Sequence, residues 1–377
     1  RLPTLAANAS ASRARSSGAS GPARTSEHYA NSLDASWELD LFGGKRLAGE
    51  AADATWQAAQ EDLRDVQVSL CAEVALAYVE VRAYQWRLSI AESNLVVQTD
   101  THDLARWRQQ AELVTQLDVD QARLGLEQTR AGIPALRSSL EQSKHRLATL
   151  LGLPPGALLT ALGDRRAIPV ASREIAVGVP ADVLRRRPDV RRAERQLAAQ
   201  AAQAGVAAVG RYPTFTLRGS IGLEALAAGG LYSLAARTLS GAASAGWTLF
   251  DGGRIAQGVA VQDARQDAAM GAYEAAILGA LRDVEDALVA YVGEQERQRA
   301  LADAEQAARS AAALARDRYA TGLIDFQTVL STQQALLSME DSQASSRMAI
   351  TSDLIRLYKA LGGGWSPLPP EDANANP

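Results

Sequence analysis

The sequence of 377 residues predicts a mainly α-helical fold with a small β part, built as a tandem duplicated unit. Three observations support this. Sequence features return at a spacing of 210 residues, short stretches alternate apolar and polar residues, and the long stretches 45–110 and 254–320 contain no proline. Internal repeats set the architecture of a chain. Each unit is therefore expected to combine a β-hairpin with a long helical hairpin.

The repeat is visible from the first residues to near the last. Arg1-Leu2-Pro3-Thr4-Leu5 returns as Arg211-Tyr212-Pro213-Thr214-Phe215, Trp37 returns as Trp247, and Leu151-Gly152 returns as Leu361-Gly362. The first repeat is expected at 1–152, with a β-hairpin at 2–42, a long helix at 45–110 and a return helix at 117–151. An equatorial segment and helix follow at 153–210. The second repeat, at 211–362, has its hairpin at 213–250, its long helix at 254–320 and its return helix at 325–361, before a tail at 363–377.

The strand prediction depends on alternation with a period of two, which indicates a strand with two different faces. In 32–42 the apolar residues Leu33, Trp37, Leu39 and Leu41 alternate with Asp34, Ser36, Glu38 and Asp40. In 213–222, Phe215, Leu217 and Ile221 alternate with polar residues. The partner strands, at about 2–13 and 241–250, carry a weaker signal.

The helix prediction depends on a different period. Apolar residues from Val74 to Leu95 step alternately by three and four residues, which is typical of a coiled-coil seam. Ile133, Leu140 and Leu147 continue such a seam on the return helix. Helices this long need lateral neighbours, so we expect the two copies and further chains to pack against one another. Pro134 is expected to kink its helix.

Composition excludes several classes of function. The 39 basic and 43 acidic residues nearly balance, which argues against a nucleic-acid partner. No run of 18 apolar residues predicts a transmembrane helix, whereas a membrane β-barrel gives too weak a signal per strand to be excluded. His28, His102 and His145 are scattered without metal-ligand spacing, so neither an enzyme site, a cofactor nor a metal is expected. Cys71 is expected to be a small buried residue.

The second copy has a helical segment, 189–210, before its strand. The counterpart in the first copy would precede Arg1, where no signal peptide begins. We therefore expect an N-terminal region to be missing from this sequence.

Three motifs carry a resemblance to a known family. They are Leu184-Arg185-Arg186-Arg187-Pro188-Asp189-Val190-Arg191-Arg192-Ala193-Glu194, then Trp247-Thr248-Leu249-Phe250-Asp251-Gly252-Gly253-Arg254, and Leu357-Tyr358-Lys359-Ala360-Leu361-Gly362-Gly363-Gly364-Trp365. Together with the duplication they resemble the TolC-like outer-membrane factors, most closely the OprM-type branch that serves resistance–nodulation–division (RND) efflux pumps.

The resemblance implies a homotrimer in the outer membrane of a Gram-negative bacterium. Each chain of the trimer would give four strands to one twelve-stranded barrel in the outer-membrane lipid. This barrel would be continuous with a trimeric α-barrel across the periplasm. The partners implied are a periplasmic adaptor (a membrane fusion protein) and an inner-membrane RND-type transporter. Family members are often lipoproteins, but Cys71 does not match their lipid-carrying cysteine.

The resemblance also names site candidates. Asp118, Tyr319, Gly322, Asp325 and Ser331 would lie at the periplasmic tip, where the channel closes. In the run Val329-Leu330-Ser331-Thr332-Gln333, Ser331 stands where family members often have an aspartate, which implies a different or weaker gate. The alternative interpretations, without a role in gating, are that Asp118 is a solvated charge at a helix start and that Tyr319 packs in a seam between helices.

The strands supply the other candidates. Leu33, Leu39, Leu41, Phe215 and Leu217 would face lipid. Trp37 and Trp247 would lie at the membrane interface, or would pack at an ordinary strand–helix junction. Two other functions stay open: a type I secretion exit duct, and a periplasmic helical-hairpin adaptor or scaffold.

Overall fold

The structure is a computed structural model and describes residues 2–15, 25–169 and 185–363. These residues fall into two compact units. One unit combines Arg1–Gln60 with Arg192–Ala275, and the other combines Glu61–Arg191 with Ala276–Pro377. The first unit contains the strands, and the second contains most of the helical hairpins.

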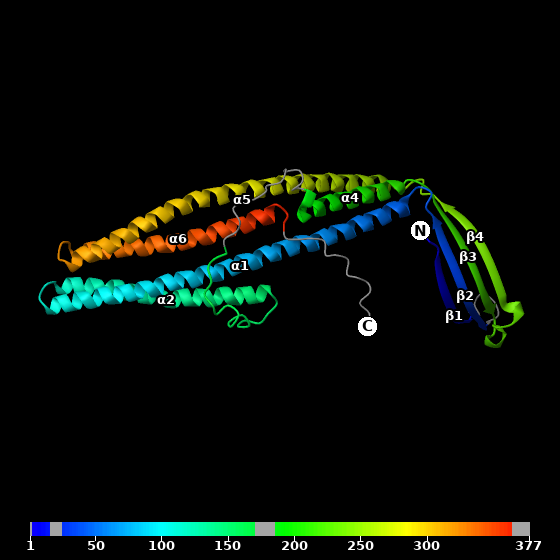
Figure 1. Ribbon diagram of the computed structural model, residues 1–377. Coiled ribbons are helices and arrows are strands. Elements are labelled where there is room, and N and C mark those ends of the chain that lie inside the picture. The colour runs from blue at the N-terminus through cyan, green and yellow to red at the C-terminus, as the bar shows by residue number, and fades with distance from the viewer. Residues whose placement is uncertain (1, 16–24, 170–184, 364–377) are drawn as a thin grey trace, which may run out of the picture. The chain divides into compact units, whose positions relative to one another are not determined.

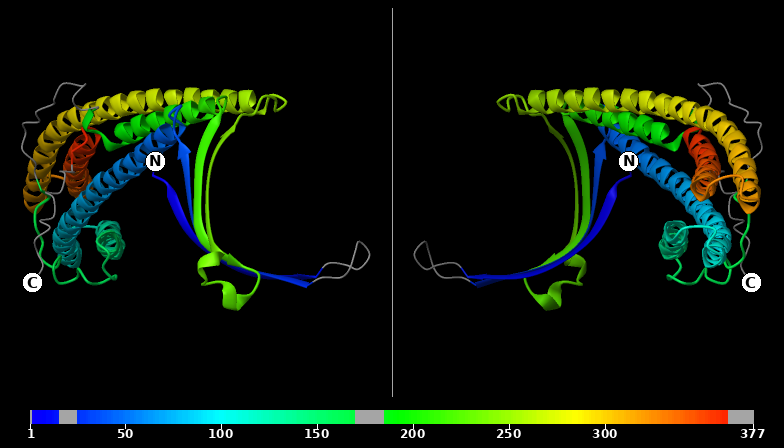
Figure 2. Two further views of the ribbon diagram at one scale, coloured as in Figure 1. Left: turned by 90° about the vertical axis from the view of Figure 1, so that its right-hand side faces the viewer. Right: turned by 90° about the vertical axis from the view of Figure 1, so that its left-hand side faces the viewer.

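Four antiparallel strands form one sheet in the first unit, in the order β1-β2-β3-β4 (Figure 1). The strands are β1 (Thr4–Arg15), β2 (Thr25–Leu39), β3 (Thr214–Ala225) and β4 (Arg237–Gly246). Figure 2 shows that the sheet is curved. Its central contact is between the two repeats, because β2 pairs with β3 from Tyr29↔Ala225 to Leu39↔Phe215. The short 3₁₀ turns η1 (Ala228–Gly230) and η2 (Leu234–Ala236) lie between β3 and β4.

The strand bounds differ from those that alternation indicated. β2 begins at Thr25 rather than near Ser32, because a polar stretch without apolar alternation pairs along its whole length with β1. It also ends at Leu39, before Leu41, since the next residue contacts a helix start instead of continuing the strand. Cross-strand pairing decides strand length here, and the sequence pattern of one strand does not contain it.

Two long helical hairpins follow the strands. In the first repeat α1 (Gly44–Gln110) turns back into α2 (Gln116–Leu150), and in the second α5 (Arg254–Ala320) turns back into α6 (Phe326–Ala360). Between the repeats lies α4 (Pro188–Val209). α2 continues as one helix through Pro134.

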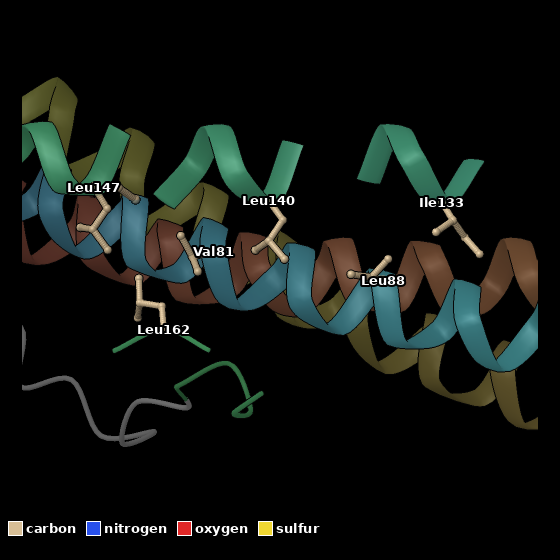
Figure 3. Close-up of a cluster of buried hydrophobic side chains, with 7 residues drawn as sticks. Val81, Leu88, Ile133, Leu140, Leu147 and Leu162 are labelled. Atoms are coloured by element: carbon tan, nitrogen blue, oxygen red, sulfur yellow. The ribbon is translucent and has the colours of Figure 1, made fainter. Parts of the chain in front are cut away.

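The expected seam of the first hairpin is confirmed. Val81 and Leu88 of α1 pack with Ile133, Leu140 and Leu147 of α2 in one buried cluster (Figure 3). Leu162, from the segment after α2, joins the same cluster. This apolar packing holds the two helices together along several turns.

Cys71 is exposed, so the expectation of a buried thiol was wrong. The reason is its place in the heptad. The buried residues of α1 next to it are Val68 and Ala72, whereas Leu70 is 43% exposed, so Leu70 and Cys71 both lie outside the buried stripe.

Candidate functional site

The sheet has one apolar and one polar face. All three strand pairs are in regular antiparallel register, and the register places odd-numbered residues opposite odd-numbered residues throughout. Successive side chains of a strand point to opposite faces. The predicted Leu33, Leu39, Phe215 and Leu217 therefore share one face, with Trp37 directly opposite Leu217.

The apolar face is strongly exposed in the single chain. Leu33 is 48% exposed, Ile221 opposite it is 59% exposed, and Leu239 on the edge strand β4 is 83% exposed. A contiguous exposed apolar surface of this kind marks contact with lipid or with another protein.

The opposite face is polar and connected by hydrogen bonds. Asp34 accepts hydrogen bonds from Asn8 Nδ2 at 2.6 Å and from Ser32 Oγ at 2.8 Å. Across β2 and β3, His28 and Glu224 lie 2.7 Å apart. This face suits water and polar solutes.

The strand–helix junctions of the two repeats are built alike. Asp40 accepts hydrogen bonds from the backbone N–H groups of Lys45 and Arg46, at the start of α1. Asp251 accepts from the N–H groups of Gly253 and Ile255, at the start of α5. Each carboxylate satisfies helix N-terminal donors that lack an intrahelical partner.

The two tryptophan candidates lie at different places. Trp37 is within β2, whereas Trp247 follows the end of β4 and donates its indole N–H to the carbonyl of Arg211 at 3.1 Å. Leu41 lies outside the strand and is 62% exposed. Leu41 therefore belongs to the junction rather than to the apolar face of the sheet.

The predicted gate residues lie in or beside the turns at the far ends of the helical hairpins. In the α5–α6 turn Gly322 has φ +76°, a conformation that glycine adopts without strain. The equivalent residue of the α1–α2 turn is Glu112, with φ +60°. The same backbone hydrogen bond closes both turns, from Leu113 N to Arg108 O and from Leu323 N to Arg318 O, each at 2.9 Å.

Asp118 and Asp325 both cap return helices. Asp118 forms a capping box with Thr115 at the start of α2. Asp325 accepts hydrogen bonds from the hydroxyl and the backbone N–H of Thr328, both at 2.7 Å, at the start of α6. These two hydrogen bonds, the hydroxyl first, lower the pKa of the Asp325 carboxyl below its ordinary 3.8. Ser331 is exposed and donates its hydroxyl to the carbonyl of Thr328.

Tyr319 lies in a cluster that joins the two turns. The cluster contains residues of all four long helices: Ala105, Val119, Ala122, Ala315, Tyr319, Phe326 and Val329. The ring of Tyr319 packs against Phe326, with centroids 5.3 Å apart. Its hydroxyl is buried and has no hydrogen-bond partner among the described residues.

Arg108 is the residue that binds one turn to the other. Its guanidinium lies 4.4 Å from the ring centroid of Tyr319 and donates to the carbonyls of Tyr319 at 2.9 Å and Ala320 at 3.1 Å. These are last-turn carbonyls of α5, which lack intrahelical donors and lie at the negative end of the helix dipole. A cation is therefore favoured at this position.

Arg108 completes a ladder of polar contacts between the repeats. Seven and fourteen residues earlier, Thr101 accepts from Gln333 Nε2 at 3.0 Å and Asn94 donates to Glu340 at 3.2 Å. Seven residues before that, Arg87 donates to both carboxylate oxygens of Asp341, at 2.6 and 3.0 Å. We call the positions 87, 94, 101 and 108 the polar seam. It occupies the same heptad position of α1 in four successive heptads.

A second arginine connects three helices near the other end of the hairpins. Arg187, which is 8% exposed, pairs with Asp189 and Asp283 and donates to the carbonyls of Ala280 and Ala360. Burial disfavours ionisation of Asp189, but the hydrogen bonds and positive charge of Arg187 outweigh it and lower the pKa of the Asp189 carboxyl. This arginine belongs to the motif after the midpoint, whose Leu184 lies outside the described residues, as do Gly364 and Trp365 of the C-terminal motif.

Sequence reasoning missed the polar seam and the roles of Arg108 and Arg187. The signal that could have found the polar seam is the seven-residue spacing of Arg87, Asn94, Thr101 and Arg108, because polar residues as well as apolar ones can repeat at one heptad position. None of the helices in the described residues carries an apolar stretch of the length and hydropathy that a membrane span requires. The same residues contain no group of His, Cys, Asp and Glu arranged to hold a metal ion.

Comparisons with known proteins identify the family. The sequence model described as "Outer membrane efflux protein" matches residues 1–153 and 179–363. The chain belongs to the outer membrane efflux protein family. A pyoverdine export outer membrane protein of Pseudomonas putida, OpmQ, is 36% identical over 92% of this chain and 73% of its own length. OprJ of Pseudomonas aeruginosa is 32% identical, over 87% of this chain and 68% of its own length.

Solved structures of outer-membrane proteins have the same fold. The outer-membrane channel OprN superimposes with a TM-score of 0.93 at 38% identity, covering 97% of this chain and 82% of OprN. The outer membrane protein VceC of Vibrio cholerae gives a TM-score of 0.89 at 25% identity, covering 97% of this chain and 88% of VceC. The protein is therefore an outer-membrane efflux channel of a Gram-negative bacterium and not an enzyme.

Proposed function

We propose that three copies of this efflux protein form the exit duct of a tripartite system. The three sheets close into one twelve-stranded barrel in the outer membrane, and the helices form an α-barrel in the periplasm. A periplasmic adaptor docks at the helical turns, and an inner-membrane RND-type transporter delivers the substrate. The protein passes that substrate on without chemical change.

The observation that carries this proposal is the two-faced sheet. Its apolar face is exposed across all four strands, and its polar face holds Asp34, Asn8 and His28. The described residues supply no strand partner for the outer edges of β1 and β4. Backbone groups without partners are not tolerated in lipid, so these edges need strands from other copies.

Strand number supports three copies. With four antiparallel strands per chain, β4 of one copy runs antiparallel to β1 of the next, so every strand pair in the ring stays antiparallel. Two copies would give eight strands, a barrel whose interior is filled by side chains. Three copies give twelve, the smallest such ring that leaves a lumen.

The helical turns are proposed as the gate. Gly322 and Glu112 have the left-handed backbone conformation that the turns need, and Asp118 and Asp325 cap the helices that follow. Tyr319 packs in the cluster between the two turns. Ser331 would line the constriction in place of the acidic ring that family members often have. Opening would separate the second hairpin from the first along the polar seam. Its exposed polar groups would then exchange their protein partners for water, at a small cost in free energy.

The names of two relatives refer to different exported compounds. OpmQ is named for pyoverdine export, and TtgF of Pseudomonas putida, 33% identical over 92% of this chain and 71% of its own length, is named for a toluene pump. Homologous channels thus serve different compounds. We infer that the adaptor and transporter select the substrate of this channel as well.

The oligomer is tested by native mass spectrometry of the full-length protein extracted in detergent. The expected mass is that of three copies, and a stable monomer or dimer would contradict the proposal. Planar-bilayer recording of the same sample checks the lumen. The expected result is a discrete ion conductance, which a filled eight-stranded barrel would not give.

A further inference from the structure

A cleft lined by arginine lies between the helical hairpins, away from the turns. It occupies about 660 Å³ and is lined by parts of α1, α5, α6 and the segment 165–168. We call it the arginine cleft. The side chains that matter here are Trp86, Arg165, Arg166, Tyr291, Arg299 and Arg347. Its volume lies within the range of small-molecule sites, about 300–1,000 Å³.

The charge of the cleft is one-sided. Four arginines line it, and no aspartate or glutamate does so among the described residues. One of the four is neutralised from outside, because Arg165 donates to Glu92 at 2.6 Å and this hydrogen bond lowers the pKa of the Glu92 carboxyl. Arg166, Arg299 and Arg347 have no carboxylate partner among the described residues, so about three positive charges face the cleft.

Arg347 is held in a position that suits an anion. Its guanidinium lies 4.6 Å from the ring centroid of Trp86. An arginine that stacks on an indole keeps the N–H groups at its edge available, in the fork that matches a carboxylate, sulfonate or phosphate. The stacking therefore holds the guanidinium of Arg347 at the cleft while its N–H groups stay available to donate hydrogen bonds to a ligand.

Tyr291 adds a polar group to the wall of the cleft. The residue as a whole is 8% exposed, and its hydroxyl has no hydrogen-bond partner among the described residues and is not sealed from solvent. The hydroxyl is therefore free to form a hydrogen bond with a ligand in the cleft.

The walls of the cleft are fixed. The segment 162–169 is tied to α1 by hydrogen bonds from Arg82 to the carbonyl of Asp164 and from Gln85 to that of Leu162, each at 2.7 Å. It is tied to α6 by the hydroxyl of Thr351, which donates to the carbonyl of Pro169 at 3.0 Å. Preformed walls lower the entropy cost of binding.

We propose that the arginine cleft binds an organic anion with a flat ring system. The rings of Trp86 and Tyr291 provide the apolar surface, and Arg347 and Arg299 bind the acidic group. Such a ligand contacts α1, α5 and α6 together. It would therefore hold the second hairpin in place relative to the first. This ligand would be distinct from the substrate that passes through the lumen.

The test is isothermal titration of the assembled protein, in a non-ionic detergent, with naphthalene-2-sulfonate and with empty micelles as the blank. Two comparison compounds separate the features of the ligand. Naphthalene-2-sulfonamide keeps the ring without the charge, and hexane-1-sulfonate keeps the charge on a chain, as an anionic lipid would. Each should bind at least about tenfold more weakly, the effect of losing one charged hydrogen bond or one ring contact.

Variants locate the site. Arg299→Gln with Arg347→Gln should weaken naphthalene-2-sulfonate by about tenfold or more. The control is Arg297→Gln, on the same helix but outside the cleft and paired with Glu294 at 3.0 Å. It should bind as the parent does, and all variants should keep the parent mass and unfolding transition.

The proposal fails under any of three outcomes: equal binding of the neutral sulfonamide, equal or tighter binding of the alkyl sulfonate, or unchanged affinity in the double variant. Tyr291→Phe gives a further check, because losing the hydroxyl should weaken binding a few-fold while leaving assembly intact.

Discussion

Two seams run along α1, and they differ in chemistry. Within the first hairpin α1 meets α2 through Val81, Leu88 and Leu140, all at most 7% exposed. Between the repeats α1 meets α5 and α6 through the polar seam, where Arg87 and Asp341 remain 31% and 44% exposed. The first interface excludes water along its length, whereas the second excludes it only in places, at the Thr101–Gln333 contact and in the cluster around Tyr319.

The difference indicates which interface lasts and which one changes. Burying apolar surface contributes roughly 25 cal/mol per Å², and that free energy is lost when the helices separate. Exposed ion pairs contribute only about 0–1 kcal/mol each, since water replaces the partner. We therefore expect each hairpin to move as a unit, with relative motion confined to the polar seam.

The largest expected effect comes from breaking the apolar seam. Leu140→Ala removes a buried side chain and should lower the free energy of unfolding by about 2–5 kcal/mol. Chemical unfolding followed by circular dichroism measures it. Leu124→Ala on the same helix, where the side chain is 59% exposed, is the control and should change stability much less. Equal losses would mean that the hairpin does not depend on this seam.

The second effect comes from breaking the polar seam at the turns. Arg108→Ala removes two partly exposed hydrogen bonds, each contributing about 1 kcal/mol, and the contact with the Tyr319 ring. Single-channel recording should show a more frequently open channel, with stability of the hairpins retained. Arg106→Ala, an exposed neighbour, should behave as the parent. Tyr319→Phe should leave channel opening as in the parent without loss of stability, because it removes a buried hydroxyl that has no hydrogen-bond partner among the described residues.

A smaller effect compares the two turns directly. Glu112→Gly relieves a left-handed conformation and should stabilise the protein by about 1 kcal/mol, whereas Gly322→Ala should destabilise it by a similar amount. Paired unfolding curves decide between them. If both variants shift stability in the same direction, the two turns do not share the backbone geometry described here.

The smallest effect is a pH dependence at the α6 cap. The pKa of Asp325 is lower in the folded protein than its ordinary 3.8. Its contribution is therefore complete above that ordinary value and disappears as pH falls through the folded value. Hydrogen exchange of the Thr328 amide should accelerate in that acidic range. Asp325→Asn keeps an acceptor without a charge, so its exchange should lack this acid step.

The sequence predicted the repeating features well and the contacts between repeats poorly. Periodicity located the first apolar seam, because each helix carries its own stripe. The pairing of β2 with β3 depends on residues about 180 positions apart in the chain, such as Trp37 and Leu217, and the length of β2 depends on its pairing with β1, so the pattern of one strand contains neither. Tyr319 and Asp118 were found through resemblance, whereas Arg108 acts on backbone carbonyls, which leave no trace in side-chain identity.

The exposed thiol of Cys71 has a practical consequence. It is the only cysteine of these 377 residues, so a spin label can be attached to them at one position per copy. Under the proposed threefold symmetry the three labels would form an equilateral triangle. Pulsed electron paramagnetic resonance would then give one label-to-label distance when the copies move in concert, and more than one when a single copy moves alone.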